Sequence, residues 1–179
     1  MSLSDLDLTA TTGVDPAEYE KPQPFSRPPL PGAHSFSREG DPDFGKTRGG
    51  DLMAKMTFKV LGGEDDGKTF IDRIFTTPST YRKSTSADDY IRACGGAPTD
   101  STVGAYVDAI NSYPGPFAAT LKWEGYCKSC ETTTIGKRGM PRFQSDEDGV
   151  LNHIATCPTC DGKVGAQAKV ARYIVEDND

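Results

Sequence analysis

Two pairs of cysteines are the residues whose type and spacing most directly indicate chemistry in this sequence. Both have C-x2-C spacing, with 26 residues between them, and they are Cys127 with Cys130 and Cys157 with Cys160. Each pair suits a tight turn that points two thiolates at one ion. Two such turns together supply the tetrahedral set of four sulfurs that zinc favours. The sequence therefore predicts one structural Zn²⁺ per chain, and Gly162 is expected to help form the second turn.

Disulfides and a redox-active dithiol are the other interpretations of these pairs. Disulfides are uncommon in proteins without a secretory signal, and the N-terminal MSLSDLDLTATTGVD lacks the basic and apolar regions of one. A thioredoxin-like site needs one reactive pair beside a βαβ unit, whereas this chain has two pairs and no such pattern. His153 could substitute as a ligand, but four cysteines already complete the shell. Cys94 lies on the apolar face of an expected helix and is predicted to be a core thiol.

A phosphate-binding pattern, G-x4-G-K-[ST], occurs twice, at Gly40–Thr47 and at Gly62–Thr69. A P-loop needs a helix directly after its glycines, because the helix N-terminus helps bind the phosphate. The residues after the downstream copy are β-branched and aromatic and predict a strand, and three acids between its glycines would repel phosphate. The upstream copy contains Pro42 and is followed by Arg-Gly-Gly. We therefore interpret both matches as turns and expect no nucleotide binding.

The elements that position the cysteines follow from the spacing of apolar residues. Residues 1–31 are acidic and proline-rich and predict a disordered arm. A short strand at 33–38 and a long Gly-rich loop at 37–51 come next. Alternation predicts strands at 52–61, 68–77 and 117–126, and the last strand is expected at 164–175. Helices are expected from an N-cap at Ser86 and from about Thr102. The cysteines occupy 127–162, and 176–179 form an acidic tip.

This order of elements is that of an OB barrel, with five strands and a helix between the third and fourth. The predicted fold class is therefore mainly β (α+β). Residues 32–126 and 163–175 are expected to form a five-stranded OB-type barrel. A four-cysteine zinc ribbon at 127–162 is inserted between strands 4 and 5. On this fold, oligonucleotides lie across strands 2 and 3 and are gripped by the 1–2 and 4–5 loops, which here are the Gly-rich stretch and the ribbon.

The chain resembles the OB-fold single-stranded-DNA-binding proteins of phage replication modules. The resemblance rests on LPG at 30–32, on MTFKVLGGEDDGKTFIDRIF at 56–75 and on the helices that follow, and it covers about 28–126 and 163–175. It implies binding of single-stranded DNA with little sequence preference, during DNA replication or recombination. The acidic end EDND resembles the C-termini through which such proteins recruit replication enzymes, although it lacks their terminal aromatic. The zinc ribbon departs from the plain form of the family.

Single-strand binding requires a basic groove with aromatic side chains on which bases can stack. The net charge of −6 disfavours a polyanionic partner, but the acids gather at the two ends. Residues 46–175 carry 17 Lys/Arg and 15 Asp/Glu. The candidate nucleic-acid contacts on the barrel and in the ribbon are Lys46, Arg48, Lys55, Lys59, Arg73, Phe75, Tyr81, Arg82, Lys83, Lys137, Arg138, Arg142 and Phe143.

An alternative function is a non-catalytic zinc-ribbon adaptor that docks proteins and never touches DNA, which the near-neutral charge of the body favours. With two histidines, no convincing pair of acids and a closed set of four sulfurs, we expect no enzymatic activity. No run approaches the roughly 20 apolar residues of a membrane helix. The sequence thus predicts a cytoplasmic protein, in the host cell if a phage encodes it, with no membrane partner.

Overall fold

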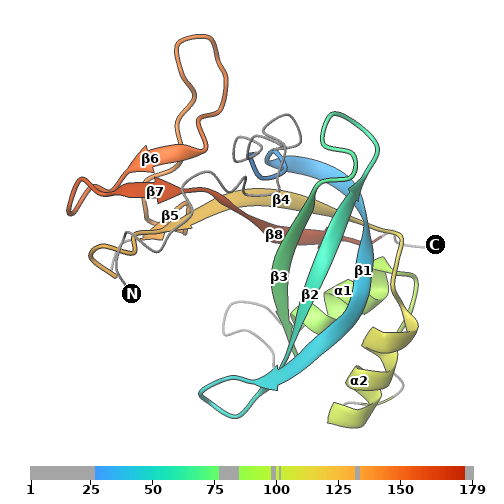
Figure 1. Cartoon of the computed structure of the whole chain (residues 1–179). Coiled ribbons are helices and arrows are strands. Elements are labelled where there is room, and N and C mark those ends of the chain that lie inside the picture. The colour runs from blue at the N-terminus through green and yellow to red at the C-terminus, as the bar shows by residue number, and fades with distance from the viewer. Residues whose placement is uncertain (1–26, 77–84, 98–99, 101, 132–133, 176–179) are drawn as a thin grey trace, which may run out of the picture.

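The computed structural model describes residues 27–76, 85–97, 100, 102–131 and 134–175. The fold is mainly β, with a six-stranded antiparallel sheet, a separate pair of strands and two helices. The elements are β1 (Gly32–Lys46), β2 (Leu52–Leu61), β3 (Thr69–Phe75), α1 (Ser86–Ala93), α2 (Val103–Ser112), β4 (Phe117–Tyr126), β5 (Thr134–Ile135), β6 (Ile154–Thr156), β7 (Lys163–Gly165) and β8 (Gln167–Ile174). The short strands β5, β6 and β7 extend from the end of β4 that is remote from α1 and α2 (Figure 1).

The strand β2 and its hairpin partner β3 have the alternation that the sequence predicts. Ala54, Met56 and Phe58 are buried on one face of β2, while the intervening residues are only half-buried. The turn at 62–67 closes the hairpin, and its three glycines all have positive φ. The Gly67 amide donates to the Val60 carbonyl at 3.0 Å. The downstream G-x4-G-K-T match is therefore a hairpin turn, as predicted.

The strand β1 is much longer than the sequence indicates. It runs through most of the segment predicted as a Gly-rich loop, and only 47–51 form the turn before β2. The upstream G-x4-G-K-T match is thus mostly strand, which corrects its interpretation as a turn. Its Gly and Pro are accommodated because the register with β2 shifts between Glu39 and Asp43. Such a bulge absorbs residues that a regular ladder would reject.

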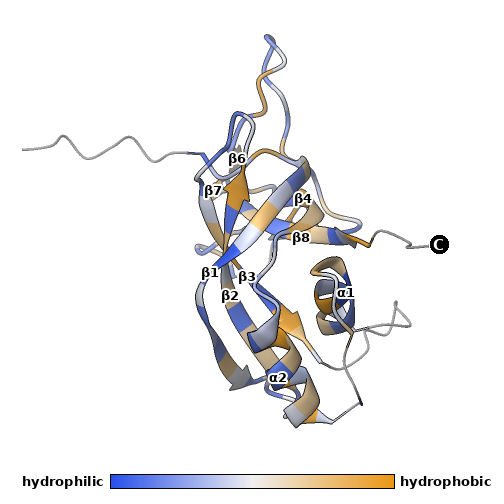
Figure 2. Ribbon diagram, turned by 90° about the vertical axis from the view of Figure 1, so that its right-hand side faces the viewer, coloured by the Kyte–Doolittle hydropathy of each residue, from blue (hydrophilic) through white to orange (hydrophobic). Residues whose placement is uncertain are grey.

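The core lies between the curved sheet and the two helices, and aromatic rings dominate it. Phe58 packs edge-on against Phe117 at 5.1 Å, and Tyr90 of α1 does so at 5.3 Å. The helix α1 begins one residue earlier than predicted, because Thr85 rather than Ser86 is the N-cap and forms a capping box with Asp88. Ala87, Tyr90 and Ile91 of α1 are buried in this core, and Figure 2 shows α1 next to β8. No helix in the described part of the chain is long and apolar enough to cross a membrane.

The sheet has the strand order β3-β2-β1-β4-β5, and β8 also pairs with β4. No ladder between described residues joins β3 to β8. A side chain bridges that gap instead. The Asp72 carboxylate of β3 accepts a hydrogen bond from the Val170 amide at 2.7 Å and lies 3.4 Å from the Lys169 amine. The Asp72 side chain therefore links the edges of β3 and β8, which also share the main core.

The last predicted strand is divided in two. Ala166 separates β7, which pairs with β6, from β8, which pairs with β4. The ladder between β4 and β8 ends at Glu124 and Gln167, which are direct partners. We call residues 125–166 the ribbon. Among the described residues β7 pairs with β6 alone, so we count residues 163–165 with the ribbon, whereas the sequence assigned them to the barrel.

Candidate metal centre and nucleic-acid face

Two similar turns bring the four cysteines of the ribbon together. Their sulfur atoms all lie within 4.8 Å of one another. The Cys127 and Cys160 sulfurs are 3.4 Å apart, and those of Cys130 and Cys157 are 3.7 Å apart. A tetrahedral site with Zn–S bonds of about 2.3 Å has edges of about 3.8 Å. The arrangement is therefore compatible with one tetrahedral metal ion, and all five cysteines of the chain are free of disulfides.

Each cysteine turn ends at an acidic residue with left-handed backbone. Glu131 follows Cys130 with φ 53°, and Asp161 follows Cys160 with φ 55°. The amides of both donate to the carbonyl of the first cysteine of their pair, at 3.0 and 2.9 Å. Asp161 is thus the left-handed residue of the second turn, and Gly162 also takes part in this turn, because its carbonyl accepts from the Cys157 amide at 2.8 Å. Gly162 allows close approach as well, because a Cβ there would lie 3.1 Å from Ser129 Oγ and 3.3 Å from Cys160 Sγ.

The ribbon packs tightly against β4 through a second, smaller core. This core contains Trp123, two of the cysteines and Ile135, Phe143 and Val164. Phe143 is 9% exposed and meets Trp123 edge-on at 5.9 Å. Its ring is therefore a packing element, which corrects the expectation that it offers a stacking surface to bases. At Gly125 a Cβ would lie 2.5 Å from Val164, so this core leaves no room for a side chain there.

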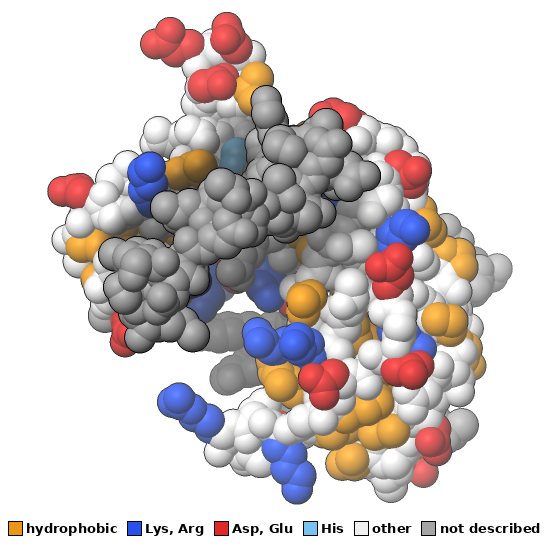
Figure 3. All heavy atoms as spheres, viewed as in Figure 1, with side chains coloured by type: hydrophobic (Ala, Val, Ile, Leu, Met, Phe, Trp, Pro, Cys, Tyr) orange, Lys and Arg blue, Asp and Glu red, His pale blue; other side chains and the backbone are white. Residues whose placement is uncertain are grey.

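The outer face of β2 and β3 gathers four of the predicted nucleic-acid contacts. We call it the β2–β3 face. The cross-strand rows pair Met53 with Phe75, Lys55 with Arg73, Thr57 with Ile71 and Lys59 with Thr69. Ile71 and Phe75 are 50% and 38% exposed. Rows two residues apart are separated by about 6.8 Å. Apolar and basic rows therefore alternate along this face, and Figure 3 shows basic side chains beside apolar ones over these strands.

Acids line the β1 side of this face. Asp43 pairs directly with Lys55 across the ladder, and Glu39 lies opposite Thr57. The Glu39 carboxylate is 3.6 Å from the Lys59 amine. This ion pair is half-exposed and weak, as such pairs usually are. The least compensated positive charge on the face is consequently at Arg73, on the strand that is remote from β1.

The remaining candidates lie on other elements. Lys46 ends β1 and Arg48 lies in the following turn, and both are exposed. Lys137, Arg138 and Arg142 are exposed in the ribbon, on a segment separate from the β2–β3 face. Tyr81, Arg82 and Lys83 lie outside the described residues. Among the described residues, the structure thus brings together the predicted contacts on the β2–β3 face and leaves the others apart from it.

Asp65 lies in the turn between β2 and β3, and from the sequence it is recognised only as one of three acids that would repel phosphate. It is 2% exposed and accepts hydrogen bonds from the Leu30 amide and the Lys68 amine at 2.7 and 2.9 Å. Burial raises the pKa of this carboxyl, but these bonds and the Arg27 guanidinium outweigh it, so that the pKa lies below its ordinary value. Lys68, the lysine of the P-loop pattern, therefore forms an ion pair with the Asp65 carboxylate.

The structure defines a mainly β protein with an inserted four-cysteine module. No protein-family profile, curated protein or solved structure matches this chain.

Proposed function

We propose that the chain binds single-stranded DNA through the β2–β3 face and acts in DNA replication or recombination. The observation that carries this proposal is the alternation of apolar and basic rows on one exposed sheet face. Exposed Phe75 and Ile71 offer surfaces for bases, and Lys55 and Arg73 between them offer charge for phosphates. Binding of single strands combines these two kinds of contact without a need for base-specific hydrogen bonds.

The strand order supports an OB-type barrel as the frame of this site. The elements of that fold are three strands in meander, a helical segment and two more strands. Here these last two, β4 and β8, pair with each other, and β4 also pairs with β1. The Asp72 bridge between β3 and β8 lies where such a barrel would close. On OB barrels the outer face of strands 2 and 3 is the usual place for oligonucleotides.

We further propose that the metal is one structural Zn²⁺. A set of four thiolates with no position left open is typical of structural zinc, whereas catalytic zinc keeps one position for water or substrate. The cysteines hold the two turns of the ribbon together and the second core is built on them. The metal would thereby shape the ribbon and supply no reaction step.

The binding proposal is tested by the salt dependence of affinity. The probe is a fluorescent oligo-dT of about 30 nucleotides, longer than the roughly 4–16 nucleotides that one OB fold covers. Each lost phosphate contact makes the log–log slope shallower by about 0.7. Between 50 and 200 mM salt, the parent should lose about threefold more affinity than Arg73→Gln. The matched control is Arg92→Gln, which removes an exposed arginine from the last turn of α1 and should keep the parent slope.

The stacking contribution is measured in the same titration. Phe75→Ala should weaken binding by about 1–3 kcal/mol with the slope unchanged, because stacking releases no counterions. If the parent does not bind oligo-dT at low salt, the proposal is wrong. If it binds but Arg73→Gln and Arg92→Gln behave alike, the DNA lies elsewhere on the molecule.

A recess in the ribbon favours a second candidate, the protein-docking adaptor. It has a volume of about 370 Å³ and is lined by Ile135, Pro141, Arg142 and the strand β6, among others. Ile154 of β6 is 48% exposed. The test immobilises the full chain and measures whether it retains a replication protein. Retention by a chain that does not bind oligo-dT would support this alternative.

A further inference from the structure

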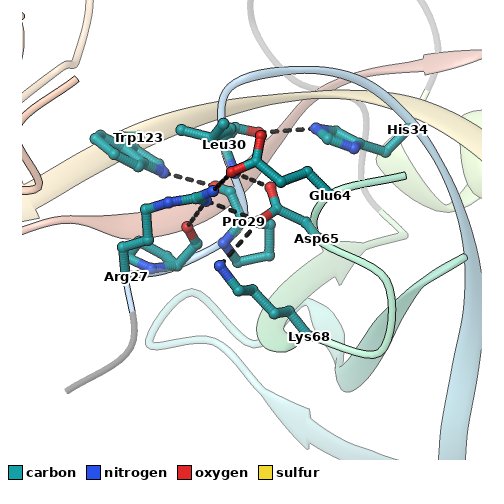
Figure 4. A network of polar contacts seen from close by, with 9 residues as sticks. Arg27, Pro29, Leu30, His34, Glu64, Asp65, Lys68 and Trp123 are labelled. Carbon is teal, nitrogen blue, oxygen red and sulfur yellow. Dashed lines mark hydrogen bonds and ion pairs between the residues drawn. The ribbon is translucent and has the colours of Figure 1, made fainter. Parts of the chain in front are cut away.

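Residues 27–31 connect the hairpin turn of the barrel to the ribbon, and we call them the strap. On the hairpin side, the Arg27 guanidinium lies 2.7 Å from an Asp65 oxygen and 2.5 Å from Glu64. The Leu30 amide donates to the other Asp65 oxygen at 2.7 Å. Figure 4 shows Asp65 enclosed by the strap on one side and by Lys68 on the other. A single buried carboxylate thus fixes the strap to the turn between β2 and β3.

The same strap is fixed on its other side to the second core. The Trp123 indole donates to the Pro29 carbonyl at 2.7 Å, in a buried hydrogen bond. The Leu30 side chain packs against the cluster that contains Trp123, Cys127 and Cys157. The Leu30 carbonyl is bonded to His34 at the start of β1 at 2.9 Å. Leu30 therefore contacts the hairpin turn through its amide and the second core, which includes two of the cysteines, through its side chain.

We propose that the strap couples metal binding in the ribbon to the turn between β2 and β3. The cysteine turns and Trp123 share one core, so loss of the metal loosens the surface on which Leu30 and Pro29 rest. The strap then leaves Asp65, and the turn loses its buried partner. Coupling of binding free energies is reciprocal. Weakening the contact of Asp65 with the strap must therefore weaken metal binding by the same factor.

The first test removes the metal from the parent protein. Hydrogen exchange at the Leu30 amide is followed in zinc-loaded protein and after chelation. The control is the Phe75 amide, which donates to Ser86 Oγ at the far end of β3. We expect Leu30 exchange to accelerate by about fivefold or more, within the usual range for coupled sites, while Phe75 exchange stays the same. Unchanged Leu30 exchange, or equal acceleration at both amides, would overturn the proposal.

The reciprocal test changes Asp65 and measures Zn²⁺ affinity by competition with a chromophoric chelator. Asp65→Asn keeps the shape of the side chain and removes its charge, and should weaken zinc binding by about fivefold or more. Asp66→Asn is the matched control, because Asp66 is exposed in the same turn and its carboxylate accepts from the Gly62 amide within that turn. Its zinc affinity should equal that of the parent. Equal affinities in all three proteins would refute the coupling, whether or not the chain binds DNA.

Discussion

Glu131 occupies a backbone conformation that suits glycine, and replacing it should strengthen metal binding. A non-glycine residue in the left-handed region is disfavoured by about 1–2 kcal/mol. Glycine avoids this but makes the unfolded chain more flexible, at a cost of about 0.4–1 kcal/mol. For Glu131→Gly the net gain is about 0.5–1 kcal/mol, which corresponds to about 2- to 5-fold in affinity. The contacts of this turn are kept, because the Glu131 amide and carbonyl make them through the backbone.

The assay is competition for Zn²⁺ against a chromophoric chelator, since metal binding is linked to folding of the ribbon. Glu147→Gly is the matched control. It removes an identical exposed acid from the same ribbon, at a position without positive φ, and should leave affinity unchanged or lower it slightly. Asp161→Gly should gain less than Glu131→Gly, because aspartate tolerates left-handed backbone better than glutamate. The reasoning is refuted if Glu131→Gly binds zinc no more tightly than Glu147→Gly.

Two further predictions concern the metal and the strap. Elemental analysis of purified protein should give one zinc per chain. Cys127→Ser should reduce this content. Cys94→Ala should preserve it, because Cys94 packs against the main core and not against the ribbon. The pKa of Asp65 is lower in the folded protein than its ordinary value of 3.8. The charged Asp65 carboxylate therefore stabilises the strap fully above pH 3.8, and this stabilisation is lost as the pH falls through the pKa of the folded protein. As the pH falls below about 4, the Trp123 fluorescence of the parent should therefore approach that of Asp65→Asn. A difference between the two proteins that persists to the lowest pH would contradict the role given to the Asp65 charge.

The regular strands and the cysteine cluster could be predicted because each depends on local spacing. The strand β2 starts and ends at the predicted residues, since its alternation is unbroken. The helix α2 begins at Val103, directly after its N-cap Thr102, and so starts about where the sequence predicts. The proximity of the two cysteine pairs follows from the geometry of their turns. Zinc itself and the DNA contacts remain predictions.

Features that depend on distant residues could not be found in this way. The strand β1 continues through Gly40 and Pro42 because β2 supplies its partners and a bulge absorbs the irregularity. Phe143 is surrounded by polar and charged residues in the sequence, and only the approach of β4 buries it. Asp65 resembles any acid in a hairpin turn until the strap, 35 residues earlier at Leu30, covers it. Long-range burial overrides local pattern at each of these positions.

The direct pairing of Glu124 with Gln167 has an evolutionary consequence. The whole cysteine-bearing excursion departs from and returns to one rung of the β4–β8 ladder, so from the standpoint of the sheet it replaces a simple hairpin connection. Closing a longer loop adds little entropic penalty, because that penalty grows only with the logarithm of length. An ancestral chain could thus acquire or discard the module without re-registering a strand. The segment that must change with it is the strap, because Leu30 would otherwise lose the surface that covers it.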